Sequence, residues 1–390
     1  MEIIKNLMRR VYFGLGYFFP VFNHILLESH PDLSGNTFQL FEVMLKENLN
    51  EKYKLIWVVD DENAYEDYKV QNVFFKNLYP KNFLGKLHLL FLRATAKCII
   101  TENRFLPKMN NRQLVMYLSH GTILKNVFGK VVIGPKCDYV LYQSEFVKEI
   151  TAKQLQVDID KLVCLGYPRN DVLFKKSTCI EQVFDKNTFK KVIVWMPTFR
   201  QHKDKHRVDS TAYFPLGIPV VNDPEQIREL NQYLKEREVL LVLKPHPAQD
   251  LSVLNVQSLS NFVLLYDKDL RRNDIQLYEF IGNSDALITD YSSIYFDYLL
   301  TDKPIGLTIS DVEEYGGTLG FAVDDIFEVL KGEYINDFSE LLGFIDNVSK
   351  GIDETKEDRD IVKDLLNYYQ DNKSAKRVYD FIKEKANFQS

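Results

Sequence analysis

The sequence is short of cysteines, of long apolar runs and of the glycine-rich loops that bind phosphate. Its 390 residues contain only four cysteines, and none lies in a CxxC pair or at a zinc-type spacing from a histidine. We therefore expect no zinc site built from cysteine and histidine, and free, buried thiols in a reducing compartment. No run of about 20 apolar residues is present, which argues against a membrane-spanning helix. GxGxxG and P-loop motifs are absent too, so any nucleotide must be held by another device.

Positive charge is not in excess either. The chain has 49 Lys and Arg against 55 Asp and Glu, a formal net charge of −6, which argues against a nucleic-acid-binding protein. A hydrophobic content of 45% with 27% charged residues is ordinary for a globular protein. A chain of this length is expected to form two domains.

The first segment, 1–22, differs from the rest of the chain. Its apolar residues recur at helical spacing, while Lys5, Arg9 and Arg10 fall on the opposite side. Two interpretations stay open. The segment is either a helix docked on its own protein or an amphipathic anchor that lies on an anionic membrane surface.

Short apolar runs alternate with helical stretches along most of the chain. The predicted strands are 24–29, 54–59, 72–75, 97–101, 114–118, 138–142, 161–166, 191–195, 239–243, 262–265 and 286–289. Continuous apolar strands indicate sheets covered on both faces, and strand–helix alternation indicates parallel order. We therefore predict an α/β protein with doubly wound parallel sheets.

A polar stretch at 174–191 divides this series in two. We expect an N-terminal Rossmann-like domain at 23–185, a C-terminal one at 186–350, and helices at 351–390 that pack back on the domains. Two such domains facing across a cleft would bind ligands at the carboxyl ends of their strands.

Five predicted strands end in polar or proline-containing turns. The turns read SHGTILK, YPRND, MPTFR, KPHP and DYSS, and they contain His120, Arg169, Arg200, His246 and Asp290 in that order. Because the carboxyl ends of parallel strands share one edge of a sheet, these side chains are expected to line a common rim. Arg169 could hold a phosphate or pair with Asp171 as a structural clamp.

Two of these turns present a histidine. In KPHP the prolines stiffen the backbone around His246, and Lys244 and His246 could both neutralise a pyrophosphate. His120 lies beside Gly121, which permits a tight turn, and its imidazole suits proton acceptance near neutrality. A lone histidine of this kind is often structural, but the pair favours a site.

The DYSS turn precedes a predicted helix. Asp290 or Ser292 could simply cap that helix, or its start could bind a phosphate with Ser292 and Ser293 as added donors. Arg200, at the end of MPTFR, could hold a phosphate bidentately.

In this order the motifs resemble the CDP-glycerol glycerophosphotransferase family, the teichoic-acid primases and polymerases with related capsule enzymes. The resemblance begins at ILLESHPDLSGNTFQLFEVML and continues through TENRFLP, the turns above, LITDYSSIYFDYLLTDKPI and YYQDNKSAKRVYDFI. It implies a GT-B type fold of two Rossmann-like domains and transfer of a polyol phosphate from a CDP-alcohol, with release of CMP.

The resemblance also implies roles for individual residues. His120 would be the base that activates the acceptor hydroxyl, and His246 would contact the donor pyrophosphate. Arg200, Lys244, Asp290, Ser292 and Ser293 would line the donor site. The reaction would need no metal or other cofactor. The acceptor would be linked to an undecaprenyl-type lipid at the cytoplasmic face of the membrane, and a homo-oligomer stays open.

Two departures from the family pattern concern the substrates. Leu319 stands where the family usually has an arginine, and Ser119 replaces a tryptophan often found before HGT. The sequence does not distinguish CDP-glycerol from CDP-ribitol, one addition from polymerisation, or wall polymer from capsule. The alternatives are a GT-B glycosyltransferase that uses a nucleotide sugar and a non-catalytic nucleotide-sensing protein.

Overall fold

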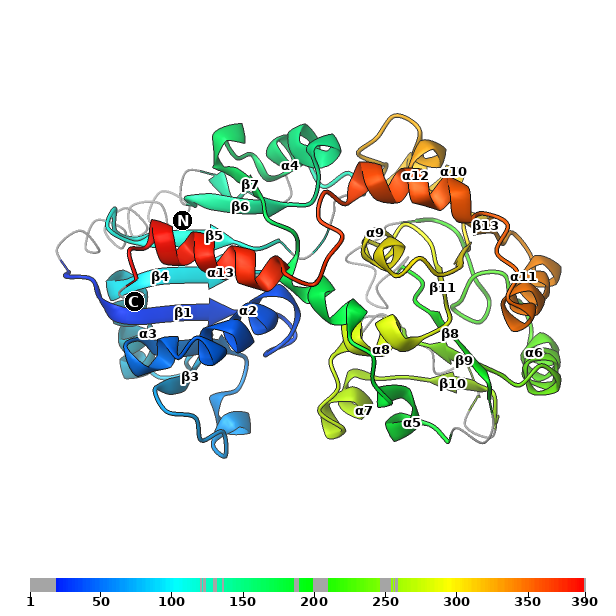
Figure 1. Cartoon of the computed structure of the whole chain (residues 1–390), viewed down its shortest axis with the longest axis horizontal. Coiled ribbons are helices and arrows are strands. Elements are labelled where there is room, and N and C mark those ends of the chain that lie inside the picture. The colour runs from blue at the N-terminus through cyan, green and yellow to red at the C-terminus, as the bar shows by residue number, and fades with distance from the viewer. Residues whose placement is uncertain are drawn as a thin grey trace. The chain divides into compact units, whose positions relative to one another are not determined.

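The computed structural model describes residues 19–119, 121, 124–128, 132–134, 137–185, 189–198, 210–245, 254, 256 and 259–388. The chain divides into two compact α/β units (Figure 1). Unit 1 takes its residues from 1–122, 128–171 and 371–390, and unit 2 takes them from 123–127 and 172–370. The division follows Asp171, whereas the polar stretch suggests a boundary at residue 185.

Unit 1 is built on a seven-stranded parallel sheet in the order β3-β2-β1-β4-β5-β6-β7. The strands are β1 (Phe22–Glu28), β2 (Lys54–Val59), β3 (Val73–Asn77), β4 (Ala96–Thr101), β5 (Leu114–Tyr117), β6 (Tyr139–Tyr142) and β7 (Leu162–Cys164). The central residues of β1, β2, β4, β5 and β6 are buried, as their continuous apolar sequences predict, whereas the edge strands β3 and β7 are partly exposed.

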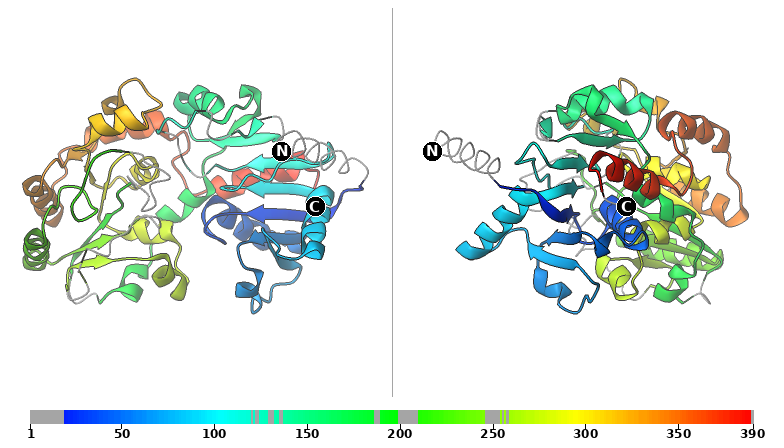
Figure 2. Two further views of the ribbon diagram at one scale, coloured as in Figure 1. Left: turned by 180° about the vertical axis from the view of Figure 1, so that it is seen from behind. Right: turned by 60° about the vertical axis from the view of Figure 1, so that its left-hand side comes forward.

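Helices cover both faces of this sheet. α2 (Gly35–Lys46) and α13 (Ser374–Lys385) pack against each other on one face (Figure 1). α3 (Phe83–Thr95) contacts β1 and β4 on the other face, where it can be followed from behind in Figure 2. The core under α2 includes Phe41 and Trp57. The centroids of their rings lie 5.4 Å apart in an edge-to-face arrangement. α4 (Lys148–Leu155) connects β6 to β7.

Unit 2 contains a six-stranded parallel sheet in the order β10-β9-β8-β11-β12-β13. The strands are β8 (Lys191–Trp195), β9 (Val239–Leu243), β10 (Phe262–Leu264), β11 (Ala286–Thr289), β12 (Ile305–Leu307) and β13 (Glu333–Tyr334). Every residue of β9 is buried, so this strand is covered on both faces.

Two helices of unit 2 pack together over the β8–β9 part of the sheet. They are α6 (Pro224–Glu236) and α11 (Phe338–Lys350). α6 starts where the Asp223 carboxylate accepts two backbone N–H groups and Pro224 supplies a preset φ. The other α-helices in the described part of unit 2 are α5 (Cys179–Val183), α7 (Asp267–Arg272), α8 (Leu277–Asn283), α9 (Ile294–Tyr298), α10 (Val312–Thr318) and α12 (Lys356–Leu366).

The structure confirms the α/β class, the parallel sheets and all eleven predicted strands. β12 and β13 were not predicted, because three and two residues are too few to show a pattern. The four cysteines are free, and three are buried. None of the helices in the described ranges combines the length and the apolar character that a membrane span requires. The expected helix at 1–22 falls almost wholly outside the described residues.

Candidate active site

The sheet order brings the predicted turns of each unit to one edge. In unit 2, KPHP follows β9, MPTFR follows β8 and DYSS follows β11, and these three strands are neighbours. In unit 1, the segments after β1, β4 and β5 leave three neighbouring strands in the same way. The predicted turns of unit 2 thus follow neighbouring strands, whereas in unit 1 the predicted turns follow β5 and β7, and the segments after β1 and β4 were not among them.

The three residues on which the sequence prediction most depends are His120, His246 and Arg200. All three lie outside the described residues. Their roles stay predictions, and the site is built here from the residues that surround them in the chain.

Asn36, at the start of α2, holds the turn that leads to His120. Its side-chain amide donates to the carbonyl oxygen of Ser119 at 2.7 Å, and its Oδ1 accepts the backbone N–H of Arg169 at 3.1 Å. Ser119 has a φ of 55°, a left-handed conformation that is uncommon outside glycine. A single buried amide thus joins the SHGT turn to the YPRND turn.

Glu28, the last residue of β1, organises the TENR segment after β4. Its carboxylate accepts the backbone N–H groups of Glu102, Asn103 and Arg104 at 3.0–3.1 Å. Burial raises the pKa of Glu28, while these three donors and the Arg104 charge oppose the shift. Three bonds to one carboxylate fix the backbone of this loop.

Glu102 is a second buried carboxyl group at the same edge. Burial raises its pKa to about 7, against the opposing charge of Arg169 and the backbone N–H of Thr37, which donates at 3.0 Å. Gly35 permits this approach: a Cβ there would lie 2.3 Å from Oε1 of Glu102, and its φ is +66°. A residue with a Cβ would collide with the carboxylate, so glycine is what allows the start of α2 to lie this close to Glu102.

Asp171, which the sequence offers as a partner for Arg169, binds the start of α13. Its two carboxylate oxygens accept the backbone N–H groups of Ser374 and Ala375 at 2.9 and 2.8 Å, and so cap the start of α13. Burial raises the pKa of Asp171 to about 6.

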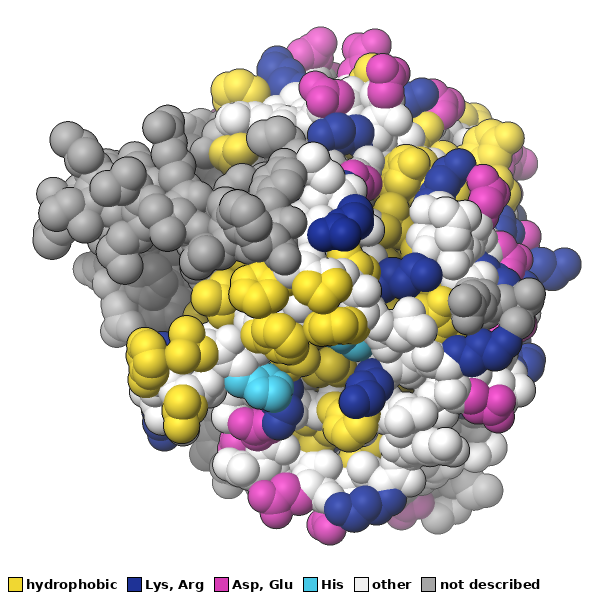
Figure 3. Space-filling model, turned by 90° about the vertical axis from the view of Figure 1, so that its left-hand side faces the viewer, with side chains coloured by type: hydrophobic (Ala, Val, Ile, Leu, Met, Phe, Trp, Pro, Cys, Tyr) yellow, Lys and Arg dark blue, Asp and Glu magenta, His cyan; other side chains and the backbone are white. Residues whose placement is uncertain are grey.

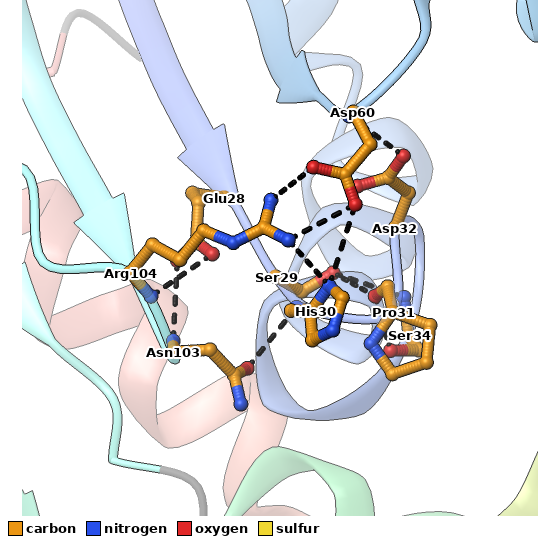
Figure 4. A network of polar contacts seen from close by, with 9 residues as sticks. All are labelled: Glu28, Ser29, His30, Pro31, Asp32, Ser34, Asp60, Asn103 and Arg104. Atoms are coloured by element: carbon orange, nitrogen blue, oxygen red, sulfur yellow. Dashed lines mark hydrogen bonds and ion pairs between the residues drawn. The ribbon is translucent and has the colours of Figure 1, made fainter. Parts of the chain in front are cut away.

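An exposed network lies beside these buried groups (Figure 4). The Arg104 guanidinium binds Asp60, with Nη2 3.0 Å from Oδ2, and the same Nη2 lies 2.8 Å from Nδ1 of His30. The hydrogen bond from Arg104 is the main cause that lowers the pKa of Asp60. Asp32 accepts the backbone N–H of Asp60 at 2.9 Å, so the loops after β1, β2 and β4 are tied together.

In unit 2, Asp290 is fully buried at the end of β11. Its two carboxylate oxygens accept the backbone N–H of Thr198 at 3.0 and 2.8 Å, and the Thr198 hydroxyl also bonds to it. Thr198 belongs to the MPTFR turn. Asp290 therefore holds that turn against β11, and Asp290 is not the cap of α9.

Of the other donor-site predictions, Ser292, Ser293 and Lys244 are described, and they follow β11 and β9 at the same edge. Ser293 is the N-cap residue of α9, but its side chain makes no capping hydrogen bond there, and Ser292 and Ser293 are both half-buried. Lys244 is buried, and its Nζ lies 2.8 Å from Oδ1 of Asp267, at the start of α7. The structure thus confirms a turn at DYSS, and it adds an ion-pair partner for Lys244.

Sequence reasoning missed a short pairing inside unit 2. Leu124 accepts the backbone N–H of Ala322, and the backbone N–H of Asn126 donates to Gly320. Residues 124–126 thus pair with 320–322, next to Leu319. The ring of Phe321 stacks on Tyr315 at 5.6 Å, and Nζ of Lys125 lies 5.9 Å from the centre of the Tyr315 ring.

The described residues include no group of three or more His, Cys, Asp or Glu side chains placed to hold a metal ion. The carboxylates of Glu28, Glu102 and Asp290 accept backbone N–H groups, and Lys244 pairs with Asp267.

The family model for CDP-Glycerol:Poly(glycerophosphate) glycerophosphotransferase matches residues 18–384. The teichoic acid poly(glycerol phosphate) polymerase of Bacillus spizizenii is 28% identical over 333 residues, which are 77% of each protein. The teichoic acid glycerol-phosphate primase of Bacillus subtilis is 24% identical over 330 residues, 78% of each. The ribitol-phosphate polymerase TarL of Staphylococcus aureus is 25% identical over 90% of this chain and 60% of its own length.

Solved structures show the same fold. The wall teichoic acid polymerase TagF superposes with a TM-score of 0.71 at 22% identity, over 98% of this chain and 96% of the other. A variant of TagF soaked with CDPG gives a TM-score of 0.70 at 22% identity and the same coverage. The predicted GT-B type fold is thereby confirmed.

Proposed function

The chain belongs to the CDP-glycerol:poly(glycerophosphate) glycerophosphotransferase family, and from that premise we propose the step that it catalyses and the residues that perform it. It transfers a polyol phosphate from a CDP-alcohol in the synthesis of a teichoic-acid-type polymer. We propose that the acceptor is a hydroxyl of a lipid-linked chain. The family match over residues 18–384 is the observation that supports this most.

The proposed step is a displacement at the β-phosphorus of the CDP-alcohol. The acceptor oxygen forms a bond to that phosphorus while the bond to the oxygen bridging the two phosphates breaks. CMP leaves with the bridging oxygen, and the product is a phosphodiester. His120 takes the hydroxyl proton, and His246 neutralises the departing phosphate. Positioning and charge neutralisation supply most of the rate in such a transfer.

The described residues support a positioning role for Asn36 and Asp290. Asn36 fixes Ser119, the residue before His120, and Asp290 fixes Thr198, two residues before Arg200. Ser292, Ser293, Arg200 and Lys244 are proposed to contact the donor phosphates and ribose. Asp290 is proposed to act through Thr198, because both of its carboxylate oxygens are engaged there.

We further propose that the protein works at the cytoplasmic face of the membrane as a peripheral protein, since its acceptor is a lipid. Protein cations alone are proposed to balance the donor charge, without a metal ion. Turnover that is unchanged by a chelator would support this part of the proposal, and loss of turnover restored by Mg²⁺ would overturn it.

The donor is tested by incubating the enzyme separately with CDP-glycerol, CDP-ribitol and a UDP-sugar, with a lipid-linked acceptor present. Relatives named for glycerol phosphate and for ribitol phosphate both match the chain, so both CDP-alcohols are needed. Release of CMP and growth of the acceptor by one polyol phosphate support the proposal. Release of UDP from the sugar donor would show glycosyl transfer instead.

A further inference from the structure

A hollow lies at the carboxyl edge of the unit 1 sheet, where the neighbouring strands β2 and β3 end. It has a volume of about 770 Å³, which is within the range of small-molecule sites. Its lining comes from residues 60–63 after β2, from residues 76–82 at and after the end of β3, and from the first two turns of α3. This cavity is called the β2–β3 hollow. No described residue of the five motif turns lines it.

Hydrogen bonds and ion pairs hold the walls of the β2–β3 hollow in place. The carboxylate of Glu62 binds Nζ of Lys76 at 3.1 Å and accepts the side-chain amide of Asn77 at 2.8 Å. The backbone N–H of Glu62 donates in return to Oδ1 of Asn77 at 2.8 Å. Asp60 forms an ion pair with Arg104 (Figure 4). The hollow is therefore preformed, which lowers the entropic cost of binding a ligand.

The charges of the lining balance one another. Each of the two ion pairs is neutral, and among the other lining side chains Asp61 and Lys81 carry opposite charges, while His88 adds an imidazole. Figure 3 shows charges of both signs beside apolar side chains on the face that it presents. A phosphate in the hollow would face Asp61 and the carboxylates of both ion pairs. The described residues also include no group of His, Cys, Asp and Glu placed to hold a metal ion. An uncharged ligand fits this balance.

The hollow presents the kinds of group that recognise a sugar ring. Tyr79 is 74% exposed, and its ring contacts no other aromatic ring among the described residues. An aromatic ring packs against the C–H face of a sugar, while carboxylate and amide groups bond to the hydroxyls around its edge. Oδ1 of Asp61 accepts the backbone N–H of Asn63 at 3.1 Å, whereas its Oδ2 has no hydrogen bond to a described residue. Asn82 uses only its Oδ1, which accepts the backbone N–H of Gly85 at 2.6 Å, so its amide N–H groups remain for a ligand.

We propose that the β2–β3 hollow binds an uncharged sugar ring that is part of the acceptor. The acceptor role rests on the proposed function, whereas the binding of a sugar does not. The hollow shares its edge of the sheet with the SHGT turn, because the strand order from β2 to β5 is β2-β1-β4-β5. Three strand spacings amount to roughly 14 Å, a distance that a short chain of further units spans. An open-chain polyol offers no ring face to Tyr79, so we expect it to bind more weakly than a sugar.

The experiment is saturation-transfer NMR of the full chain with small ligands. The probes are N-acetylglucosamine and the methyl glycosides of glucose, galactose and mannose, and the comparison compounds are glycerol, ribitol and glycerol 3-phosphate. Tyr79→Ala removes the ring, and its control is Tyr368→Ala in unit 2, where the side chain is also exposed. Asp61→Asn keeps the oxygen that caps the 3₁₀ helix after β2 but loses the carboxylate. Its control is Asp325→Asn in unit 2, where the carboxylate caps a 3₁₀ helix by accepting the backbone N–H of Phe327 at 2.8 Å.

We expect at least one of the four sugars to bind the wild type. Tyr79→Ala and Asp61→Asn should bind it about tenfold more weakly, while both controls bind it as the wild type does. The absence of saturation transfer to every sugar overturns the proposal, and so does equal binding by Tyr79→Ala and Tyr368→Ala. Glycerol 3-phosphate that binds through the hollow more tightly than the sugars would show an anion site. Glycerol or ribitol that binds as tightly as the sugars would show an open-chain polyol site, and either result overturns the sugar site.

Transfer kinetics separate the sugar site from the proposed function. With a water-soluble acceptor that contains the bound sugar, Tyr79→Ala should raise the KM for the acceptor about tenfold and leave the KM for the CDP-alcohol unchanged. An unchanged acceptor KM in a variant that has lost sugar binding would overturn the acceptor role of the hollow. If the wild type transfers nothing from any CDP-alcohol yet binds a sugar through the hollow, the proposed function fails and the sugar site stands.

Discussion

Asn36 donates a hydrogen bond of 2.7 Å to the carbonyl oxygen of Ser119 and so ties the start of α2 to the residue that precedes His120. The same side chain accepts the backbone N–H of Arg169 at 3.1 Å. The two motif turns of unit 1 therefore depend on one amide that is fully buried. Among the described residues, the hydrogen bonds of the Asn36 side chain go to backbone groups, so we expect its effect on turnover to pass through the backbone at Ser119.

The first prediction separates this positioning role from a merely structural one. In Asn36→Asp the acceptor for Arg169 remains, but the donor to Ser119 is lost and a carboxylate faces a carbonyl oxygen. We expect kcat to fall at least tenfold, with an unchanged KM for the CDP-alcohol. Stability should fall by about 1–3 kcal/mol, the usual cost of an unsatisfied buried group.

The matched control is Asn367→Asp in unit 2, where a buried side-chain amide donates to the carbonyl oxygen of Phe296 at 3.0 Å. It should lose a similar stability in urea unfolding and keep its kcat. Equal losses of kcat in the two variants would remove the positioning role from Asn36.

The second prediction concerns Gly35. A Cβ at this position meets Oε1 of Glu102 at 2.3 Å, whereas Gly351, with a similar φ of +71°, has no atom within 4 Å of its added Cβ. Gly351→Ala should therefore cost only the left-handed backbone strain of about 1–2 kcal/mol. Gly35→Ala should cost more than this and should also lower turnover. Chemical denaturation of the two variants checks the difference, and equal losses would show that the contact with Glu102 is easily relieved.

The third prediction concerns pH. Burial raises the pKa of Glu102 from its ordinary value of 4.5 to about 7, so between these values the folded protein holds a proton that the unfolded chain has released. The contribution of Glu102 to the free energy of unfolding is therefore fully present below pH 4.5. It is lost as the pH rises through 7, and the loss is at most about 3 kcal/mol. Glu102→Gln should remove this loss. Urea unfolding at pH 5 and pH 7.5 would show it, and identical pH profiles for the variant and the wild type would refute it.

Much of the fold could be predicted because its pattern is local. Continuous apolar runs such as Val239–Leu243 predict strands covered on both faces, and their alternation with helices predicts parallel order. The edge strands β12 and β13 could not be predicted, since strands of three and two residues have no periodicity of their own. The division after Asp171 could not be predicted either, because it depends on contacts between residues far apart in the sequence.

The candidate site shows the same limit. The turns that follow β8, β9 and β11 could be predicted to share one rim, because the carboxyl ends of parallel strands lie at one edge of a sheet. The partner of Asp290 could not, because Thr198 lies 92 residues away in the sequence. Glu28 and Glu102 were missed for a similar reason: a carboxylate in an apolar run gives no sign that it accepts backbone N–H groups. The position of Glu28 at the end of a buried strand marks it as unusual, although it does not reveal which groups the carboxylate binds.

The fourth prediction distinguishes the two histidines. We expect His120→Ala to abolish turnover while the CDP-alcohol still binds, because a general base acts on the acceptor and supplies roughly 10²–10⁴-fold of the rate. His246→Ala should weaken donor binding as well as turnover. Calorimetric titration with the CDP-alcohol reads binding apart from catalysis. Lost binding in His120→Ala would place that residue in the donor site, and full binding in His246→Ala would remove it from there.

The most direct test of the account follows the oxygen atom that bridges the two phosphates of the donor. With that oxygen labelled as ¹⁸O in a CDP-alcohol that the enzyme uses, attack of the acceptor on the β-phosphorus sends the whole label into CMP. Mass spectrometry of the released nucleotide and of the extended acceptor reads its position. We predict labelled CMP and an unlabelled phosphodiester. Label in the extended acceptor, or release of CDP in place of CMP, would contradict phosphotransfer at the β-phosphorus.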